Sequence, residues 1–409
     1  MTPSERKILL FTSAAHTLTH INMLIFPALV MPVSRALGLS LARVVNMSFW
    51  SYLLYGALAT PWGLLSDRIG HKWALCSGLL ISGSGLILAG VFPASGSIAA
   101  SFALVGIGSA AYHPSAVSML SQSIRERGRA MGINGMWGNI GMAVVPFTVG
   151  LLNFVIGWRK GLILLGSLGC ALGAVGLLAH FDVKRGEDQK VVEPIARGMA
   201  NRLLVILGVG LIFSGLMYRS YTVILPTFLE YRLGNLTEDF RRWVVSRLID
   251  VRNVPAFNTL VANLVATGLY VLGAIGQGIG GRIADRCSLK WLYFIFYALA
   301  LPFVVATAWI ANAWLIPTVG IFMLFALGAL PIENSLVAYL TPARWRSVSY
   351  GIKYTLIFGV GSLAVKLVGW VQESYGLTSV IWLIAGFAAC FLIIIGIFLV
   401  FSRGHSFKH

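Results

Sequence analysis

Twelve apolar runs, each about long enough to cross a membrane, constrain this chain more than any other feature of its sequence. A bilayer core about 30 Å thick is crossed by a helix of roughly 20 apolar residues. Helices satisfy their own backbone hydrogen bonds, whereas lone strands would leave polar groups unpaired in lipid. We therefore predict an all-α integral membrane protein with 12 transmembrane helices. The expected spans are 8–33, 44–65, 73–93, 98–121, 129–155, 160–181, 203–229, 258–281, 290–311, 313–340, 347–372 and 377–401.

The composition agrees with this class and excludes several others. Apolar residues make up 57% of the chain, and Asp, Glu, Lys and Arg only 11%, against about 25% in soluble proteins. The surface of a soluble fold needs more charge than this, so a cytosolic enzyme, a disordered chain and a secreted disulfide scaffold are excluded. The four cysteines form no Cys-x-x-Cys pair, which predicts buried free thiols rather than a metal or redox site.

Two longer polar stretches interrupt the series of spans. The first, 182–201, is rich in charged residues. It predicts a flexible cytoplasmic linker between two sets of six helices. The second, 230–257, has apolar and basic residues on different faces around 241–249. That pattern predicts an amphipathic helix on the extracytoplasmic membrane surface, with a short connecting helix as the alternative. The predicted parts are an N-terminal bundle at 1–181, the linker at 182–202, a C-terminal bundle at 203–401 that contains the 230–257 insertion, and a cytoplasmic tail at 402–409.

The basic residues indicate the orientation of the chain in the membrane. Lys and Arg number 31 against 14 Asp and Glu, a net charge of +17, which in a soluble protein would suggest a nucleic-acid partner. Here most of them lie in alternate loops, beginning with the N-terminus, and such a bias marks the cytoplasmic side. We predict that both termini are cytoplasmic, that the membrane is a bacterial inner membrane, and that no nucleic acid is bound. The basic residues of 230–257 lie on the opposite side and are not explained by topology.

The two halves of the chain contain similar motifs in the same order. Gly63-Leu-Leu-Ser-Asp67-Arg68-Ile-Gly70-His-Lys72 follows the second span, and Gly281-Arg-Ile-Ala-Asp285-Arg286-Cys-Ser-Leu-Lys290 follows the eighth. The matches predict a duplicated fold, and transporters built from repeats place the substrate site between the halves near the midplane. An Asp in each motif can cap a helix or pair with Arg and so close the cytoplasmic side. The predicted cytoplasmic gate comprises Gly63, Asp67, Arg68, Gly281, Asp285 and Arg286.

Six plus six spans, a basic central linker and Gly-x-Leu-Ser-Asp-Arg-x-Gly-x-Lys after the second span resemble the major facilitator superfamily over essentially the whole chain. This resemblance implies two pseudo-symmetric six-helix bundles and transport by alternating access. It also implies a cavity lined by the first, fourth, seventh and tenth helices.

Within the superfamily, the element Tyr112-His113-Pro114 in the fourth span resembles the fosmidomycin-resistance-like branch of efflux proteins. The Arg that typical drug/proton antiporters carry early in that helix is absent, and Phe102 lies near its place. Their Gly-Pro motif in the fifth helix is reduced to separate residues. These two differences from typical drug/proton antiporters argue against export of that kind, but they do not argue against transport.

Polar residues inside the apolar spans are the candidate site residues, because charge at membrane depth costs about 2.5–3.5 kcal/mol or more. Glu333 is the only carboxylate well inside a span. The predicted substrate and proton site comprises His20, Asn22, His113, Arg219, Tyr221, Glu333, Asn334 and Lys353. The resemblance implies that those on the cavity-lining helices, His20, His113, Arg219 and Glu333, converge on the cavity.

Two of these residues have specific predicted roles. The guanidinium of Arg219 stays charged and offers a planar fork for a carboxylate or phosphonate, so we expect it to bind an anionic substrate. The alternative is that Arg219 pairs with Glu333 or a backbone carbonyl and only locks helices together. Burial and a nearby cation have opposite effects on the affinity of Glu333 for a proton, so movement between environments could load and release one. The alternative is a static pair with Lys353.

His16 and His20 lie four residues apart, a spacing that can bind zinc. No third ligand is evident nearby in the sequence, so no metal site is predicted. No cofactor is expected, and a proton or Na⁺ is the predicted coupling ion.

Taken together, these features predict a secondary active transporter that moves a small anionic or amphiphilic organic solute by proton-coupled efflux. The alternatives are proton-coupled uptake of an organic anion or other nutrient, and a non-transporting receptor. The sequence contains no Gly-x-Ser-x-Gly, His-Glu-x-x-His or P-loop motif, so an enzyme or an ATP-driven pump is not predicted. The expected partners are a small molecule and the lipid bilayer, and the protein is expected to be a monomer.

Overall fold

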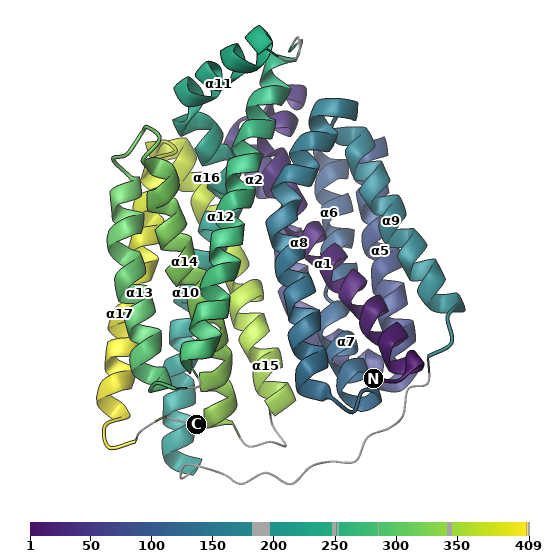
Figure 1. The fold of residues 1–409 in the computed structure, drawn as a ribbon, viewed down its shortest axis with the longest axis vertical. Helices are drawn as coiled ribbons and strands as arrows, with labels where there is room; N and C mark the ends of the chain where they lie inside the picture. Colours follow the sequence, from purple (N-terminus) through teal and green to yellow (C-terminus); the bar gives the residue numbers. More distant parts are fainter. Residues whose placement is uncertain are drawn as a thin grey trace. The chain divides into compact units, whose positions relative to one another are not determined.

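The computed structural model describes residues 1–181, 197–247, 251, 253–284, 286–341, 346–405 and 407. Most of the predicted linker therefore lies outside the described residues. Within them the chain is helical and contains no strand (Figure 1). The elements are α1 (Pro3–Leu37), α2 (Leu41–Met47), α3 (Phe49–Ala57), α4 (Ala59–Ile69), α5 (His71–Val91), α6 (Ser95–Ser109), α7 (Tyr112–Ser123), α8 (Arg127–Ile156), α9 (Trp158–Leu178), α10 (Arg197–Arg232), α11 (Gly234–Arg247), α12 (Val254–Ala284), α13 (Leu289–Thr307), α14 (Leu315–Leu340), α15 (Arg346–Tyr354), the π-helix η2 (Thr355–Gly359), the 3₁₀ turn η3 (Val360–Ser362), α16 (Leu363–Tyr375) and α17 (Ser379–Phe401).

Eleven helical segments in the described residues are long and apolar enough to cross a membrane. The predicted second span, 44–65, is instead divided among α2, α3 and α4, none of which is long enough by itself to cross a membrane. The breaks fall at Ser48 and Leu58, both of which keep right-handed helical backbone angles. The chain therefore continues in helical form through this region, with two interruptions that its apolar composition does not signal.

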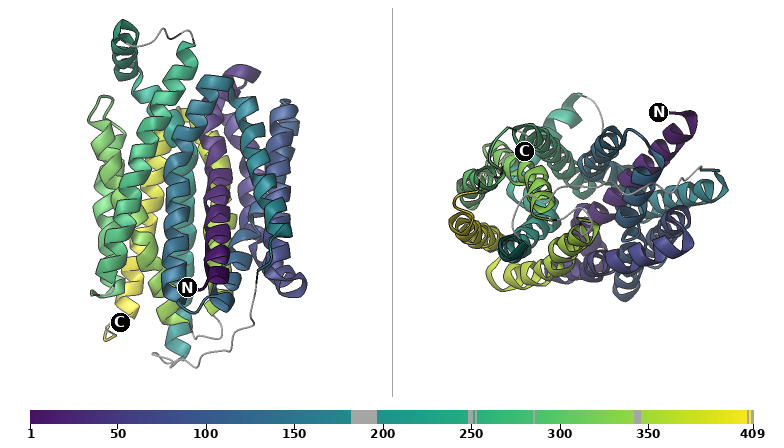
Figure 2. Two further views of the ribbon diagram at one scale, coloured as in Figure 1. Left: turned by 45° about the vertical axis from the view of Figure 1, so that its right-hand side comes forward. Right: turned by 90° about the horizontal axis from the view of Figure 1, so that it is seen from below.

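The helices group into two compact units. Unit 1 comprises Met1–Asp188, Leu225–Glu230 and Thr237–Thr267, and unit 2 comprises Gln189–Ile224, Tyr231–Leu236 and Gly268–His409. In unit 1, α5 packs against α6 and α9, and α1 packs against α8 (Figures 1 and 2). In unit 2, α13 packs against α14 and α17. The domain boundaries predicted from the sequence stay a prediction.

Unit 1 contains two segments from the second half of the chain, held by polar contacts. Arg35, near the end of α1, forms an ion pair with Glu230 of α10, and Thr259 of α12 donates a hydrogen bond to the same carboxylate at 2.9 Å. The Asn263 amide donates to the carbonyl oxygen of Ala28 at 3.2 Å. These contacts explain why Leu225–Glu230 and Thr237–Thr267 group with the N-terminal helices.

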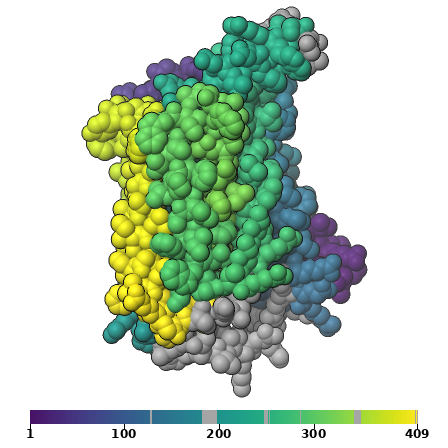
Figure 3. Space-filling view, turned by 60° about the vertical axis from the view of Figure 1, so that its left-hand side comes forward, coloured from purple at the N-terminus to yellow at the C-terminus, as the bar shows by residue number. Residues whose placement is uncertain are grey.

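Large apolar side chains remain exposed on the long helices. On α17, which lies along α13 (Figure 3), Ile393, Val400 and Phe401 are each more than half exposed. Exposed apolar surface of this extent is unfavourable in water but is solvated by lipid tails.

The predicted amphipathic segment contains the helix α11. Val244 of this helix is buried with Val251 and Phe257, while Arg242 is exposed. Glu238 accepts hydrogen bonds from Arg241 and Arg242, and these two guanidinium groups lower the pKa of its carboxyl to about 2. Part of the basic charge in 230–257 is thus offset locally. The location of α11 on a membrane surface stays a prediction, and residues 248–250 lie outside the described part of the chain.

Glycine allows close approach between helices of unit 2, as between other membrane helices. A Cβ atom at Gly276 of α12 would overlap the carbonyl oxygen of Leu324 on α14, whereas one at Gly278 would meet no atom within 4 Å. We expect Gly276→Ala to lower the free energy of unfolding by about 1–3 kcal/mol, the usual cost of overpacking. Denaturant titration in detergent measures this. Gly278→Ala, two residues away on the same helix, is the control, and equal effects of the two substitutions would contradict the packing.

Candidate functional site

The site residues predicted from the sequence fall into two groups, one in each unit. Unit 2 holds Arg219 and Tyr221 on α10, Glu333 and Asn334 on α14, and Lys353 on α15. Unit 1 holds His20 and Asn22 on α1 and His113 on α7. Each group is described within its own unit, and the predicted convergence on one cavity stays a prediction.

A buried ion pair forms the centre of the unit 2 group. The Nζ atom of Lys353 lies 2.7 Å from Oε1 of Glu333, and the two side chains are only 4% and 0% exposed. The other carboxylate oxygen, Oε2, accepts a hydrogen bond from the Tyr293 hydroxyl at 2.5 Å and one from the Ser214 hydroxyl at 3.4 Å. Side chains from α10, α13 and α15 thus surround one carboxylate on α14. A buried charge requires such partners, because desolvation without them costs several kcal/mol.

The helix that carries Lys353 changes its hydrogen-bonding pattern two residues after this lysine. The π-helix η2 and the 3₁₀ turn η3 interrupt the predicted span 347–372. Lys353 also donates a hydrogen bond to the side-chain oxygen of Asn334, and the Tyr350 hydroxyl donates to the Asn334 carbonyl oxygen at 3.1 Å. Single-turn π segments occur frequently at functional sites. Hydropathy gives no sign of this irregularity, because the segment remains apolar.

Arg219 is deeply buried in α10. Its side chain is among the largest that the described core encloses, with the residue 2% exposed. The guanidinium carbon lies 5.8 Å from the centre of the Tyr218 ring. Tyr218 in turn contacts Tyr221, with ring centres 5.4 Å apart.

The Tyr221 hydroxyl is buried and has no hydrogen-bond partner among the described residues. A buried hydroxyl without a partner costs about 1–3 kcal/mol.

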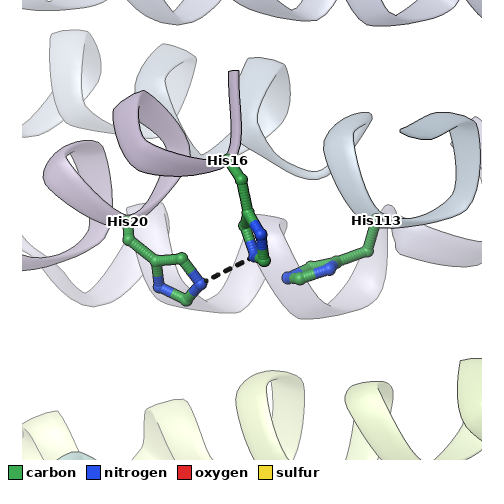
Figure 4. A group of neighbouring side chains, drawn as sticks. All are labelled: His16, His20 and His113. Atoms are coloured by element: carbon green, nitrogen blue, oxygen red, sulfur yellow. Dashed lines mark hydrogen bonds between the residues drawn. The ribbon is translucent and has the colours of Figure 1, made fainter. Parts of the chain in front are cut away.

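In unit 1 the structure brings His20 and His113 together with a third imidazole, that of His16 (Figure 4). The Nε2 atoms of His16 and His20 are 3.1 Å apart. Asn22 does not belong to this cluster, since its amide donates to the Ser109 hydroxyl at 3.3 Å. From the sequence, His20 and His113 were expected to share a cavity, but His113 was not recognised as a third ligand beside the pair of His16 and His20.

The predicted gate residues lie at the ends of α4 and α12. Asp67 and Arg68 are exposed in the last turn of α4, and the described residues give Asp67 no hydrogen bond or ion pair. The residue that precedes α5 as its cap is Gly70, with φ of +95°, rather than Asp67. Arg286 is exposed after α12, and Asp285 lies outside the described residues. The gating role of these residues stays a prediction.

The motif glycines make the same contact in both halves. A Cβ atom at Gly63 would lie 3.4 Å from the side chain of Pro114, and one at Gly281 would lie 3.7 Å from that of Pro331. Each motif helix thus packs with its glycine against a proline of the neighbouring long segment. This repeated contact agrees with the duplication indicated by the sequence.

The motif lysines have a structural role that the sequence analysis missed. Lys72 donates hydrogen bonds to the carbonyl oxygens of Leu177 and Ala179 at 2.8 and 2.6 Å, at the end of α9. Lys290 occupies the same motif position in the second half and donates to the Ser402 carbonyl oxygen, at the end of α17, at 2.6 Å. The last carbonyls of a helix lack partners within it, and a lysine can satisfy them. The sequence did contain a sign of this shared role, because Lys72 follows Gly63 at the same spacing as Lys290 follows Gly281.

Comparison with known proteins decides the family. The family model described as Major Facilitator Superfamily matches residues 11–236, more than half of the chain. The chain belongs to the Major Facilitator Superfamily. It is an integral membrane protein of a transporter family, and the predicted fold class is confirmed.

Individual relatives are distant. The chain is 27% identical to the probable L-galactonate transporter of Escherichia coli over 62% of its length and 55% of that relative's length. It is 24% identical to the fosmidomycin resistance protein of Escherichia coli over 80% of the chain and 77% of that protein. A crystal structure of a bacterial homologue of the human lysosomal transporter Spinster has a TM-score of 0.73 at 17% identity, covering 99% of this chain and 100% of the other. At this identity the likeness shows the fold alone.

Proposed function

We propose that this member of the superfamily is a proton-coupled secondary transporter of a small organic anion that works by alternating access. The observation that carries the proposal is the buried pair of Glu333 and Lys353, with both carboxylate oxygens of Glu333 contacted. A membrane-embedded charge is costly, so an ionisable group there is a functional candidate by default. Glu333 is the one carboxylate well inside a predicted span.

Protonation of Glu333 would change its partners. A proton added to Oε1 removes the charge that attracts Lys353, so the ion pair is lost and the ammonium needs another acceptor. Asn334, which already accepts a hydrogen bond from Lys353, is adjacent. Because Lys353 lies two residues before the π-helix η2, a shift of its side chain would act close to an irregular segment. The network can thereby couple one proton to a change in helix geometry.

The predicted site residues of unit 2 include two basic side chains and one carboxylate, which supports an anionic substrate. Glu333 and Lys353 offset each other, and Arg219 adds a permanent buried cation. A guanidinium presents a planar set of donors that fits a carboxylate, phosphonate or nitrate. The Tyr221 hydroxyl supplies a further donor two residues away. Among the relatives, one that matches 62% of this chain is named for L-galactonate, an organic anion.

Export is the proposed direction, and both termini are proposed to be cytoplasmic. The relative named for fosmidomycin resistance supports export, with a match over 80% of this chain. The basic loops that alternate along the sequence support the orientation. Uptake and ligand sensing without transport are the competing outcomes.

The experiment that tests this proposal combines binding and flux. Purified protein would be heated with galactonate or fosmidomycin, and with neutral galactose as control, because a ligand stabilises the state that binds it. Each stabilising anion would then be followed across proteoliposomes. We expect at least one anion to raise the melting midpoint and to cross the membrane, with galactose doing neither. Binding without flux would indicate a receptor, and stabilisation by galactose alone would contradict an anion site.

A further inference from the structure

Three histidines from two helices meet in unit 1. His16 and His20 lie one turn apart on α1, and His113 is the second residue of α7. One ligand nitrogen from each ring can be chosen such that all three lie within 4.8 Å of one another. Figure 4 shows the rings turned toward a common centre, with His16 between the other two. The centre of the His16 ring lies 4.8 Å from the centre of the His20 ring and 5.4 Å from that of the His113 ring.

The surroundings of His16 fix which of its nitrogens faces the cluster. Its Nδ1 atom lies 2.8 Å from the carbonyl oxygen of Asn134 on α8. A carbonyl oxygen only accepts hydrogen bonds, so Nδ1 carries the proton and the neutral ring keeps a lone pair on Nε2. That Nε2 atom points to His20. A hydrogen bond from the second ring nitrogen to a backbone carbonyl is the usual outer support of a metal-binding histidine.

The ring of His16 is also held in place by its neighbours. Tyr112 stacks on it with ring centres 4.6 Å apart and an interplanar angle of 19°. The Tyr112 hydroxyl donates to the side-chain oxygen of Asn134 at 3.0 Å. Gly138 of α8 leaves room for the ring, since a Cβ atom there would lie 2.6 Å from Nε2 of His16. Asn134, Tyr112 and Gly138 thus orient one imidazole without using its Nε2 lone pair.

We propose that His16, His20 and His113 together bind one divalent transition-metal ion of the borderline class, such as Zn²⁺ or Co²⁺. Neutral imidazoles suit these ions, whereas Ca²⁺ and Mg²⁺ prefer oxygen ligands, and the cluster in the described residues includes no carboxylate. Zinc–nitrogen bonds of about 2.0–2.1 Å in tetrahedral geometry place ligand nitrogens about 3.4 Å apart. The Nε2 atoms of His16 and His20 are joined by a hydrogen bond of 3.1 Å, in which His20 donates to the His16 lone pair. This separation is near the ligand spacing, so a metal ion could replace the shared proton once the proton of His20 moves to its Nδ1 atom. One ligand nitrogen from each of the three rings lies within 4.8 Å of the others. Three histidines leave a fourth position open for water or an anion.

This inference goes beyond the proposed function and does not depend on it. Full-length protein without a polyhistidine tag, stripped with a chelator in detergent, would be titrated with Co²⁺. We expect one equivalent to bind, with the visible absorption of four-coordinate Co²⁺, and Zn²⁺ to displace it. His20→Gln and His113→Gln are each expected to weaken binding by at least about 10–100-fold, a loss that even outer-shell changes can cause.

Two matched controls separate the site from general damage. His71→Gln removes an imidazole outside the cluster and should bind Co²⁺ as the unchanged protein does. Gly138→Ala should weaken binding by displacing the His16 ring, whereas Gly135→Ala, on the same helix with no atom within 4 Å, should not. Failure of the unchanged protein to bind one equivalent, or wild-type affinity in His113→Gln, would overturn the proposal. The readout involves no transport, so this failure is distinct from a failure of anion or proton coupling.

Discussion

The Glu333→Gln variant is expected to lose proton-driven transport while keeping exchange of substrate across the membrane. Glutamine has a similar shape to the protonated acid but cannot release a proton, so the step that depends on the imposed gradient stops. We expect the gradient-driven rate to fall by about 100-fold or more, an effect typical of removing a group that transfers a proton. Exchange of labelled for unlabelled substrate needs no net proton movement and should persist. Both rates can be measured in the same proteoliposome preparation.

The control variants address the partner that Glu333→Gln leaves behind. Lys353 would remain as a buried cation without its counter-charge, and breaking a buried pair costs about 3–5 kcal/mol. The double variant Glu333→Gln with Lys353→Met removes both charges and should fold while still lacking proton coupling. Glu373→Gln changes an exposed carboxylate near the end of α16 and should leave transport unchanged. Proton-driven transport at the wild-type rate in Glu333→Gln would reject the coupling role and leave a static pair.

The Arg219→Ala variant is expected to bind the transported anion about 10–100-fold more weakly. A hydrogen bond to a charged group contributes about 1.5–3 kcal/mol, and each 1.4 kcal/mol is a factor of ten in affinity. Arg219→Lys keeps the charge but loses the planar fork, so its affinity for the anion should lie between those of the unchanged protein and Arg219→Ala. The concentration dependence of the thermal shift, measured with the anion that stabilises the unchanged protein, gives these affinities without any flux assay.

Two further substitutions test whether the effect of Arg219→Ala is specific to the buried site. Arg202 lies exposed on the same helix, so Arg202→Ala removes equal charge without changing the buried site and should bind the anion normally. Tyr221→Phe removes a hydroxyl that has no partner among the described residues, so it should weaken anion binding without destabilising the free protein. Unchanged anion affinity in Arg219→Ala would remove the binding role and favour one in which Arg219 only holds helices together.

The spans were predictable because each depends on a continuous property of the local sequence. An apolar run of about 20 residues has few alternatives to a membrane helix. The breaks at Ser48 and Leu58 and the π-helix η2 were not predictable, because the interrupted segments keep the same composition. At η2 the backbone packs closely against another helix, a contact that local composition does not encode. Gly215 of α10, for example, lies very close to η2. A Cβ atom at Gly215 would be 2.7 Å from the backbone of Ile357 in η2.

The ionisable residues of the candidate site could be predicted from the sequence, but the residues that hydrogen-bond to them could not. The cost of charge in lipid singles out Glu333 and Lys353 from the sequence, and the structure pairs them. Tyr293 and Ser214, which contact the same carboxylate, are ordinary residues of apolar helices whose directions only the fold defines. The same holds for His113, because the i,i+4 spacing of His16 and His20 carries no information about α7.

The most direct test of the central claim is accumulation of the anion driven by a proton gradient alone. Proteoliposomes would be prepared with equal anion concentrations inside and outside, and a pH difference would then be imposed. We expect net movement of the anion that builds up a concentration difference, that is abolished by a protonophore and that is absent in Glu333→Gln. No net movement of the anion after the pH difference is imposed, or movement that is unaffected by the protonophore, would contradict proton coupling through this site.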